Sequence, residues 1–287
     1  MSVIVLTKDE AANLPACLES VAGWAAEIFV VDSGSTDATV EIARQAGAVV
    51  VEHPFESHTA QWRWALDALP IRHEWVLGLD ADQRVTPELA QSIATAIETR
   101  PTSDLAGLFV NRRQIFRGRW IRHGGYYPKY LLKLFRRDAV WLDDRDFVDH
   151  HFRVRGRTGR LAGDLIEDNR NEANIADWIE KHNRYARRQA MEEIARRAAK
   201  SGEPVPVSGP DARTARLKSI WIRLPRYVRP TAYFFYRYVL RLGFLDGKEG
   251  FIFHALQAFW YRLLVDINID ELTSMNRAYS RAQRVPR

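Results

Sequence analysis

Four short apolar segments separated by helical patterns constrain the fold of this chain more than any other feature. They are Ser2–Leu6, Ile28–Val31, Val49–Val51 and Trp75–Leu79. The segments are too short for typical helices and show no apolar–polar alternation, as expected for strands that are covered on both faces. Strands that alternate with helices predict a parallel sheet with helices on both sides. With 287 residues and 46% hydrophobic content, the chain can bury a substantial core.

The segments between these strands carry helix signals. Asn13 is expected to cap a helix that runs to about Ala22. Further helices are expected up to about Ala46 and over His58–Leu69. The first half of the chain is therefore expected to alternate regularly between strands and helices.

The fourth strand ends in two carboxylates, Asp80 and Asp82, before a helix that Thr86 is expected to cap and that begins at Pro87 and runs to about residue 99. Two ionised carboxylates this close repel each other, and a divalent cation relieves the repulsion. Magnesium or manganese held by one or two carboxylates completes its shell with water and phosphate oxygens. An acidic turn without a metal is the alternative interpretation.

Polar residues end three of the predicted strands, namely Thr7, Asp32 and Asp80. Ligands of parallel α/β sheets bind beyond the carboxyl ends of the strands. A single aspartate at such a position is often only a turn former, but three polar residues at one edge indicate a binding site. The loop Ser33–Asp37 matches neither a Walker loop nor a dinucleotide motif, so the sequence supports neither an ordinary kinase nor a dehydrogenase.

Three ordered motifs within residues 2–82 resemble the nucleotide-binding half of family 2 glycosyltransferases, which have the GT-A fold. The motifs are Val5–Glu10, Val30–Asp37 and Leu79–Asp82. The resemblance implies an α/β fold with a Rossmann-like mixed sheet flanked by helices, and a nucleotide-sugar donor. It also implies that Mg²⁺ or Mn²⁺ bound by Asp82, with Asp80, holds the donor diphosphate. The residues that it implies for nucleotide-sugar binding are Thr7, Glu10, Asp32, Ser33 and Asp80.

The middle of the chain reads as strands around Leu108–Val110 and Leu131–Phe135, joined through His123–Lys129. Two glycines beside two tyrosines suggest a loop in which aromatic rings meet a sugar, although the tyrosines could equally serve in packing. The end of the second strand resembles the element that closes the active site in this family. Lys133 and Arg136 are therefore our candidates for contact with the donor phosphates.

Titratable side chains are densest in Leu142–Phe152. An inverting sugar transfer needs a carboxylate that takes the proton of the acceptor hydroxyl. Asp149 is our first candidate for this base and Asp146 the second. The neighbouring His150 and His151 point to opposite faces if this segment is a strand, so they are not expected to bind one metal together.

The remaining sequence divides into helical segments around a linker. We expect a GT-A catalytic domain over residues 1–200, with a nucleotide-binding half (1–99) and an acceptor half (100–200) that ends in a helix from Glu172 to Lys200. Gly and Pro mark a linker at residues 201–211. Residues 212–287 form a basic, aromatic helical extension, in which Arg213–Arg241 carries eight basic residues and no acid.

Basic and aromatic residues on helices too polar to span a bilayer indicate a surface that lies on an anionic membrane, here residues 212–267. A packed helical pair or a nucleic-acid-binding surface would use the same residue types. Gly243–Phe251 resembles the tail of the lipopolysaccharide-core and exopolysaccharide enzymes of the family, which favours the membrane. No membrane span is expected, and the single Cys17 gives no internal disulfide.

The sequence therefore predicts an inverting, metal-dependent glycosyltransferase of polysaccharide biosynthesis. The donor is expected to be UDP-linked and the acceptor a lipid-linked glycan at the inner face of the cytoplasmic membrane. A net charge of +6 agrees with phosphate-bearing partners. A nucleotidyltransferase is one alternative, but it would need a Gly-rich basic loop after the first strand. A non-enzymatic membrane- or RNA-binding protein is the other.

Overall fold

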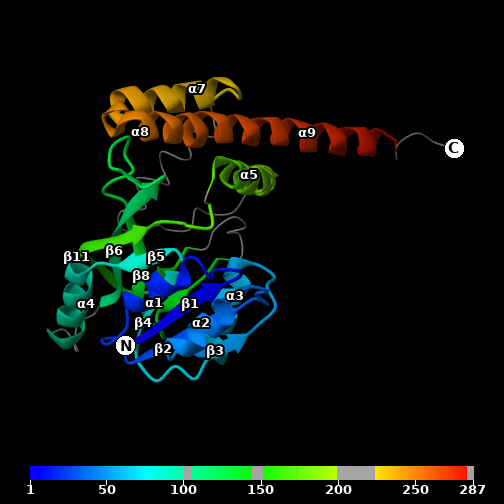
Figure 1. The fold of residues 1–287 in the computed structure, drawn as a ribbon. Coiled ribbons are helices and arrows are strands. Elements are labelled where there is room, and N and C mark those ends of the chain that lie inside the picture. The colour runs from blue at the N-terminus through cyan, green and yellow to red at the C-terminus, as the bar shows by residue number, and fades with distance from the viewer. Residues whose placement is uncertain (100–104, 144–150, 173, 199–223, 283–287) are drawn as a thin grey trace. The chain divides into compact units, whose positions relative to one another are not determined.

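The computed structural model describes residues 1–99, 105–143, 151–172, 174–198 and 224–282 (Figure 1). The chain forms two compact units, residues 1–173 and 174–287. The helix that we assigned to the end of the catalytic domain belongs to the second unit, so the compact units divide 27 residues before the predicted boundary at residue 200. The predicted linker at 201–211 lies outside the described residues.

The described residues of the first unit form a large sheet, a two-stranded ribbon and four helices. Its elements are β1 (Ser2–Thr7), α1 (Leu14–Glu19), β2 (Glu27–Asp32), α2 (Thr39–Gln45), β3 (Val49–Glu52), α3 (His58–Ala68), β4 (Trp75–Asp80), β5 (Gln83–Val85), α4 (Pro87–Thr99), β6 (Leu105–Phe116), β7 (Arg119–Ile121), β8 (Tyr130–Arg136), β9 (Val140–Trp141), β10 (Arg153–Val154) and β11 (Arg157–Glu167). The four strands and four helices expected in the first hundred residues are all present.

The large sheet is mixed, as expected. Its order is β3-β2-β1-β4-β8-β6-β11-β5, and β7 pairs with β6 (Figure 1). β1 to β4 pair in parallel, whereas β8 runs antiparallel to both β4 and β6. Because β6 and β11 are parallel to each other, the carboxyl ends of β1, β2, β4, β6 and β11 all reach the same edge of the sheet.

Helices cover both faces of this sheet, and alternate residues of β1 show how. Val3 and Val5 pack in one core with residues of α1, α2 and α4, whereas Ile4 packs in the other with residues of α3. All three side chains are fully buried. Two-sided burial explains why the strand is apolar throughout rather than alternating.

Thr86 and Asn13 differ in their side-chain capping bonds. The Thr86 hydroxyl accepts a hydrogen bond from the backbone N–H of Leu89 (3.3 Å), which confirms its capping of α4. Asn13 occupies the N-cap position of α1, as predicted, but its side chain makes no capping hydrogen bond. Its side chain is instead used in a polar network described below.

Gly78 lies in the middle of β4, where two aromatic rings leave no room for a side chain. A Cβ at this position would lie 2.8 Å from a ring atom of Phe152 and 3.1 Å from one of Trp62. These two rings pack edge to face, with centroids 4.8 Å apart. The close approach of the rings to the strand backbone therefore requires glycine here.

We expect Gly78→Ala to lower the free energy of unfolding by about 1–3 kcal/mol, since the added methyl group overpacks the core. Urea denaturation measures this cost. In a Phe152→Leu background the ring that blocks the methyl group is gone, so the cost of Gly78→Ala should fall. An equal cost in both backgrounds would contradict the assigned contact.

β11 was not expected from the sequence, although it joins β6 to β5 in the large sheet. It pairs in parallel with β6 and antiparallel with β5, with an irregularity between Arg160 and Asp164. Gly163 lies in this irregularity with φ of +81°, and a Cβ there would meet the backbone of Leu89 in α4 at 2.3–2.7 Å. Glycine thus allows β11 to bend closely past the start of α4.

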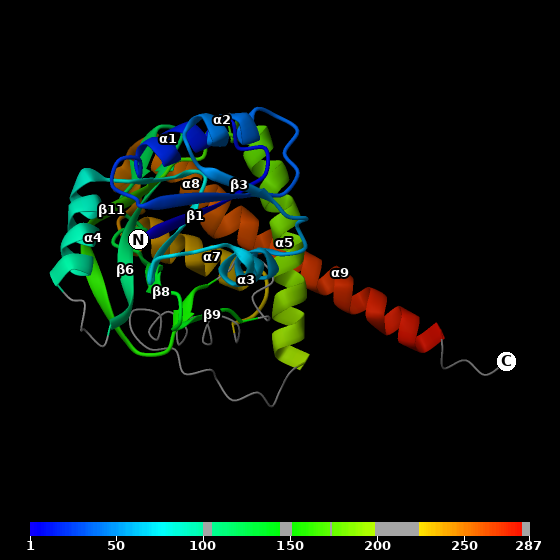
Figure 2. The same ribbon diagram turned by 90° about the horizontal axis from the view of Figure 1, so that it is seen from below.

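The second unit is helical. Its elements are α5 (Ile175–Ala198), α7 (Val228–Phe235), the π-helical turn η1 (Tyr236–Leu240), the 3₁₀ turn η2 (Gly243–Asp246), α8 (Gly247–His254), the π-helical turn η3 (Ala255–Trp260) and α9 (Tyr261–Ala282). α5 crosses α9 (Figure 2), and the contact is made by Ala186 and Ala190 of α5 with Tyr261, Val265 and Ile269 of α9. Small residues on α5 allow this close packing.

A buried ion cluster joins three helices of this unit. Arg229 of α7 is only 1% exposed and donates to Asp266 of α9 (2.7 Å) and to Glu193 of α5 (2.9 Å). From the sequence, Arg229 was counted with the basic surface of the extension, but it is internal because two acids from distant segments neutralise it. Within the described part of the chain, no helix is both long and apolar enough to cross a membrane.

Candidate active site

The central strand β1 brings the predicted site residues to one edge of the sheet. In its pairing with β2, Thr7 lies opposite Asp32, and in its pairing with β4, Leu6 lies opposite Asp80. The loops that follow these strand ends are 8–13, 33–38 and 81–82. The structure thus brings Thr7, Asp32 and Asp80 together as the strand pattern predicted.

Asp32 organises the loop that follows β2. Its carboxylate is 1% exposed and accepts hydrogen bonds from the backbone N–H groups of Gly34 (2.9 Å) and Ser35 (2.7 Å). It also accepts from the hydroxyls of Ser35 (2.5 Å) and Thr7 (2.9 Å). Asp32 is therefore a turn former as well as a residue of the candidate site, and its interactions fix the backbone of the loop beside β1.

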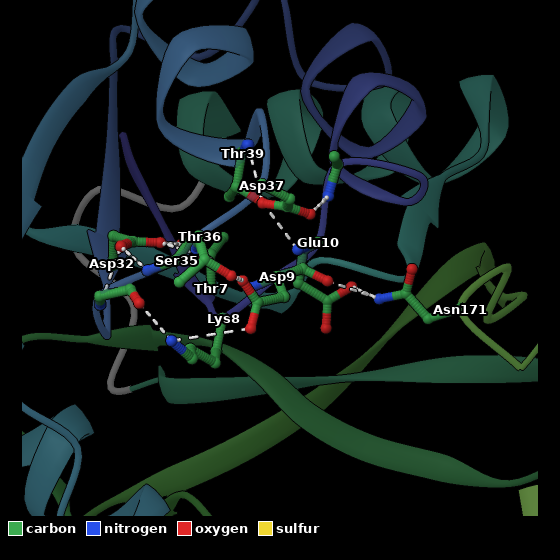
Figure 3. Close-up of polar contacts among 12 residues, drawn as sticks. Thr7, Lys8, Asp9, Glu10, Asp32, Ser35, Thr36, Asp37, Thr39 and Asn171 are labelled. Atoms are coloured by element: carbon green, nitrogen blue, oxygen red, sulfur yellow. Dashed lines mark hydrogen bonds and ion pairs between the residues drawn. The ribbon is translucent and has the colours of Figure 1, made fainter. Parts of the chain in front are cut away.

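The loop after β1 is bound to the loop after β2 through side chains (Figure 3). Asp9 has a positive φ of 54° and its carboxylate accepts from the backbone N–H of Thr36 (2.7 Å). This hydrogen bond lowers the pKa of Asp9. Lys8 reaches the carbonyl oxygen of Gly34 and lies 3.6 Å from the Asp9 carboxylate. The two loops therefore form one rigid rim.

Asp37 stabilises the same rim through hydrogen bonds to the loop after β1 and to α2. It accepts from the backbone N–H groups of Ala11 (3.0 Å) and Thr39 (3.0 Å) and from the Thr39 hydroxyl. Burial alone would raise its pKa, but these hydrogen bonds outweigh burial and lower it. Thr39 in turn accepts from the backbone N–H of Glu10 (2.7 Å), so that α2 is tied to the loop after β1.

Glu10 is held by two asparagines. Its Oε2 accepts from the side-chain amide of Asn171 (3.0 Å) (Figure 3). It also accepts from the side-chain amide of Asn13 (2.7 Å). Asn13 also accepts from the backbone N–H of Arg170 (2.7 Å), which explains why its side chain makes no capping bond to α1. The segment after β11 thereby closes one side of the rim.

Asp80 forms an ion pair with Lys133 of the adjacent strand. The ammonium group of Lys133, on the neighbouring strand β8, lies 2.8 Å from Asp80 Oδ2. The side chain of Lys133 is 6% exposed and that of Asp80 is 38% exposed, so the pair opens to solvent on the aspartate side. Cys17 lies behind this pair, and burial together with the charges of Asp82 and Asp80 raises the pKa of its thiol. We infer that the thiol is structural.

Asp82 is half-buried in the turn between β4 and β5. Its carbonyl oxygen accepts from the backbone N–H of Asp168 (3.0 Å), which follows β11. Next to it, Gln83 donates to Glu167 (3.0 Å), and Arg84 donates to Asp168 (2.7 Å). The end of β11 therefore fixes the turn that carries Asp82.

Arg136 does not reach this edge. It lies opposite Trp75 at the start of β4, whereas Asp80 is at the end of that strand. Its guanidinium pairs with Glu74 and with Asp138 (3.3 Å). The structure thus brings Lys133, but not Arg136, to Asp80, because five residues of an extended strand span about 16 Å.

The polar contacts between β6 and β11 centre on the buried carboxylate of Asp164. It accepts from Asn111 (2.8 Å), Arg113 (2.6 Å) and the Tyr127 hydroxyl (3.1 Å). Burial, and then the charge of Asp164, raises the pKa of Tyr127. Tyr127 of the predicted tyrosine loop is thus held against β11, and the neighbouring Tyr126 is buried.

Asp146 and Asp149, our candidates for the base, lie outside the described residues, as does His150. Ser33 is placed at the rim, where its backbone N–H donates to the Thr7 carbonyl oxygen (2.9 Å). Its hydroxyl accepts from Gln61 (3.2 Å).

Sequence reasoning missed the contribution of the segment after β11. Asn171 contacts the Glu10 side chain, and the backbone N–H of Asp168 contacts the Asp82 carbonyl oxygen. Glu167, the last residue of β11, accepts from Gln83 beside Asp82. Part of the signal was present, because Leu165 and Ile166 are followed by the consecutive polar residues 167–171, and polar residues also mark the ends of β1, β2 and β4. We had not identified a strand there.

The fold and the site define an α/β protein with a mixed sheet that gathers paired acids and rigid polar loops at its carboxyl edge. A family profile described as Glycosyl transferase family 2 matches residues 2–158, more than half of the chain. The chain belongs to this family. This assignment favours a glycosyl transferase over the nucleotidyltransferase and non-enzymatic alternatives.

Several curated relatives share parts of the sequence. An uncharacterized glycosyltransferase of Rickettsia felis is 39% identical over 93 residues, which cover 32% of each chain. The chain thus spans about a third of the length of this relative. The lipopolysaccharide core biosynthesis glycosyltransferase LpsC of Rhizobium meliloti is 26% identical over 205 residues, which cover 68% of this chain and 72% of LpsC.

Solved structures show partial similarity. Glucosyl-3-phosphoglycerate synthase from Mycobacterium tuberculosis, in complex with Mn²⁺, UDP and glucosyl-3-phosphoglycerate, is 24% identical with a TM-score of 0.32. The match covers 41% of this chain and 44% of that one. TarS (1–349) of S. aureus is 14% identical with a TM-score of 0.44, and the match covers 96% and 91% of the two chains.

We expect Lys133→Met to lower the free energy of unfolding by about 1–3 kcal/mol, because Asp80 loses a charged hydrogen-bond donor while it stays partly solvated. Urea denaturation measures the change. Combining Lys133→Met with Asp80→Asn should cost less than the sum of the single changes. Lys129→Met, at an exposed position just before the same strand, is the matched control, with an expected change within about 0.5 kcal/mol. An equal loss in both lysine variants would contradict the pairing.

Proposed function

We propose that the enzyme is an inverting, metal-dependent transferase that uses a UDP-linked sugar. The observation that carries this proposal is the convergence of Thr7, Asp32, Asp80 and Asp82 on one edge of the sheet, around loops fixed by their own hydrogen bonds. In this proposal Thr7, Glu10, Asp32 and Ser33 bind the nucleoside, and Asp80 faces the ribose. Loops that are already ordered before binding favour affinity, because little conformational entropy is lost when the donor binds.

The carboxylates at the end of β4 fit a divalent cation of the Mg²⁺ or Mn²⁺ type. Within the described residues no group of three or more His, Cys, Asp or Glu side chains could hold a metal ion. In this proposal Asp82 and Asp80 are protein ligands of the cation. Such ions are commonly held by one or two carboxylates together with substrate phosphates and water. Since Lys133 already pairs with Asp80, we assign the main contact to Asp82. A bound cation supplies charge neutralisation for the leaving diphosphate.

In the proposed reaction a carboxylate takes the proton of the acceptor hydroxyl while its oxygen attacks the anomeric carbon, and the bond from that carbon to the nucleoside diphosphate breaks. Asp149 is the proposed base, with Asp146 as the alternative. The proposal rests on their place in the sequence, within the acidic stretch that leads into Phe152. Attack from the face opposite the diphosphate would invert the configuration of the sugar.

Asp82→Asn tests the donor site. We expect Mn²⁺ to raise the melting temperature of the wild type in the presence of UDP, since a ligand that binds only the folded form stabilises it. The variant should lose this metal-dependent increase and at least a hundredfold in turnover of the UDP-sugar. Asp138→Asn, a carboxylate at the opposite edge of the sheet, should keep both. Full UDP affinity and turnover after chelation would contradict the proposal.

The acceptor is proposed to be a lipid-linked glycan of lipopolysaccharide or exopolysaccharide synthesis. The similarity to LpsC over two thirds of both chains supports this class of acceptor. An enzyme that extends a lipid-linked glycan has to work at a bilayer surface. We therefore propose a peripheral location on the inner face of the cytoplasmic membrane.

Exposed apolar side chains on the second unit support this location. They are concentrated on α7, η1, η2 and α8, and comprise Val228, Phe235, Tyr236, Val239, Leu240, Leu242, Phe244, Leu245 and Phe251. Leu240 is 62% exposed and Leu245 50% exposed. Arg241 and Lys248 are exposed in the same stretch. Apolar side chains with flanking cations are suited to the interface of an anionic bilayer.

Vesicle flotation tests this surface. The full chain should float with phosphatidylglycerol-containing vesicles and less with neutral ones, because the surface combines cations with apolar groups. The double variant Leu240→Asp/Leu245→Asp should lose at least tenfold in partitioning. Met275→Asp, which changes a 64% exposed apolar residue on α9, is the control and should float normally. Equal losses in the double variant and the control would contradict the assignment of the surface.

A further inference from the structure

Residues 105–137 have an unusual charge pattern. They carry nine Lys and Arg residues and no Asp or Glu. The segment comprises β6, β7 and β8 with their connections. A stretch of this charge in the middle of a sheet has to be neutralised by other parts of the chain or offered to an anionic ligand.

Acids from other segments neutralise part of this charge. The pairs are Arg112 with Glu167, Arg113 with Asp164, Lys133 with Asp80, and Arg136 with Glu74 and Asp138. Arg137 donates instead to the backbone carbonyls of Leu66 and Ile71. The basic side chains of this segment that lie within or next to β8 and in the middle of β6 therefore have partners.

The hairpin of β6 and β7 carries the remaining arginines. Arg117 and Gly118 form its two-residue turn, and both have positive φ (50° and 76°), as a tight hairpin requires. Arg117, Arg119 and Arg122 are exposed. Among the described residues no acid lies within ion-pair distance of any of these three guanidinium groups.

One face of this hairpin combines guanidinium groups with an aromatic ring. The guanidinium carbons of Arg113 and Arg122 lie 4.8 Å and 5.3 Å from the ring centroid of Trp120. Tyr127 meets the same ring edge to face, with centroids 4.8 Å apart. Arg119 pairs with Phe116 next to the turn, and by strand alternation its side chain lies on the opposite face from Trp120.

This cluster lies at the same edge of the sheet as Asp82. Gln83, directly after Asp82, pairs with Glu167, Glu167 with Gln114, and Gln114 with Ile121 beside Trp120. Three strand spacings amount to about 14 Å. The separation suits a group on an acceptor that extends away from the reacting hydroxyl.

We propose that Arg113, Trp120 and Arg122 form an acceptor subsite for an anionic saccharide, one that carries a phosphate or a carboxylate. The inference rests on the proposed function, since the subsite serves the same transfer. Guanidinium groups bind carboxylates and phosphates through paired N–H donors. The Trp120 ring holds both guanidinium groups side by side through cation–π contacts. Arg113 is held in place by Asp164, and Arg122 supplies the charge that the subsite offers to the ligand.

Ligand-observed NMR titrations of the full chain test this subsite, with UDP present to fill the donor site. The probes are glucose 6-phosphate, glucuronate and glucose, so that phosphate, carboxylate and neutral sugars are compared. We expect at least one anionic sugar to bind at least fivefold more tightly than glucose. Arg122→Gln should weaken that binding at least fivefold and Arg122→Lys should weaken it less. Arg119→Gln, with the same loss of charge on the other face of the hairpin, should stay within twofold of the wild type.

Equal binding of all three sugars, or equal weakening by Arg122→Gln and Arg119→Gln, would overturn the subsite, because bulk charge would then explain the result. A titration of the same wild-type preparation with UDP separates this failure from a failure of the proposed function. UDP binding without preference for anionic sugars overturns only the subsite. Absence of UDP binding refutes the donor site itself.

Discussion

The parallel pairing of β1 with β2 on one side and β4 on the other is the interaction on which the rest of the structure depends. Val3 and Val5 face one core and Ile4 the other, all without exposure to solvent. A slip of one residue would exchange the two faces of the strand. Core packing therefore fixes the register, and the register sets Thr7 opposite Asp32 and Leu6 opposite Asp80. The position of the site is thus a consequence of how the apolar residues are buried.

Beyond the strand ends, hydrogen bonds of polar side chains fix the backbone, as apolar packing does within the sheet. The loops after β1 and β2 contain little apolar surface, yet Asp32, Asp9 and Asp37 each accept hydrogen bonds from backbone N–H groups. Such groups would otherwise have to be satisfied by water. The two interpretations of a strand-end aspartate, turn former and site residue, are therefore compatible, because the turn that Asp32 forms gives the rim its shape.

The elements of the first hundred residues could be predicted from the sequence because their signals are local. Each buried strand is apolar throughout, each ends in a polar residue, and Thr86 caps its helix as expected. The strands after residue 100 were harder to predict. β11 mixes apolar residues with glycines and charged residues, and its pairing with β6 and β5 joins segments far apart in the chain. Likewise, Arg229 looked like a surface cation until Asp266 and Glu193 were brought to it by folding. Arg136 was assigned to the site from a motif, and a motif does not give the direction of its strand. The direction of β8 places Arg136 at the opposite edge of the sheet.

The reversal of strand direction at β8 explains how opposite charges come to share one edge. If β8 ran parallel to β4, the residue that follows β8 would lie near Asp80. Lys133, which lies within β8, would not. Because β8 runs antiparallel to β4, Lys133 reaches Asp80 from the side while the loop before β8 stays at the same edge as the strand ends. The acid-free segment 105–137 is thereby laid beside the acids of β4 and β11. Only the cations nearest the sheet find partners there, so the exposed charge is left on the hairpin, where it can act on a ligand rather than on the fold.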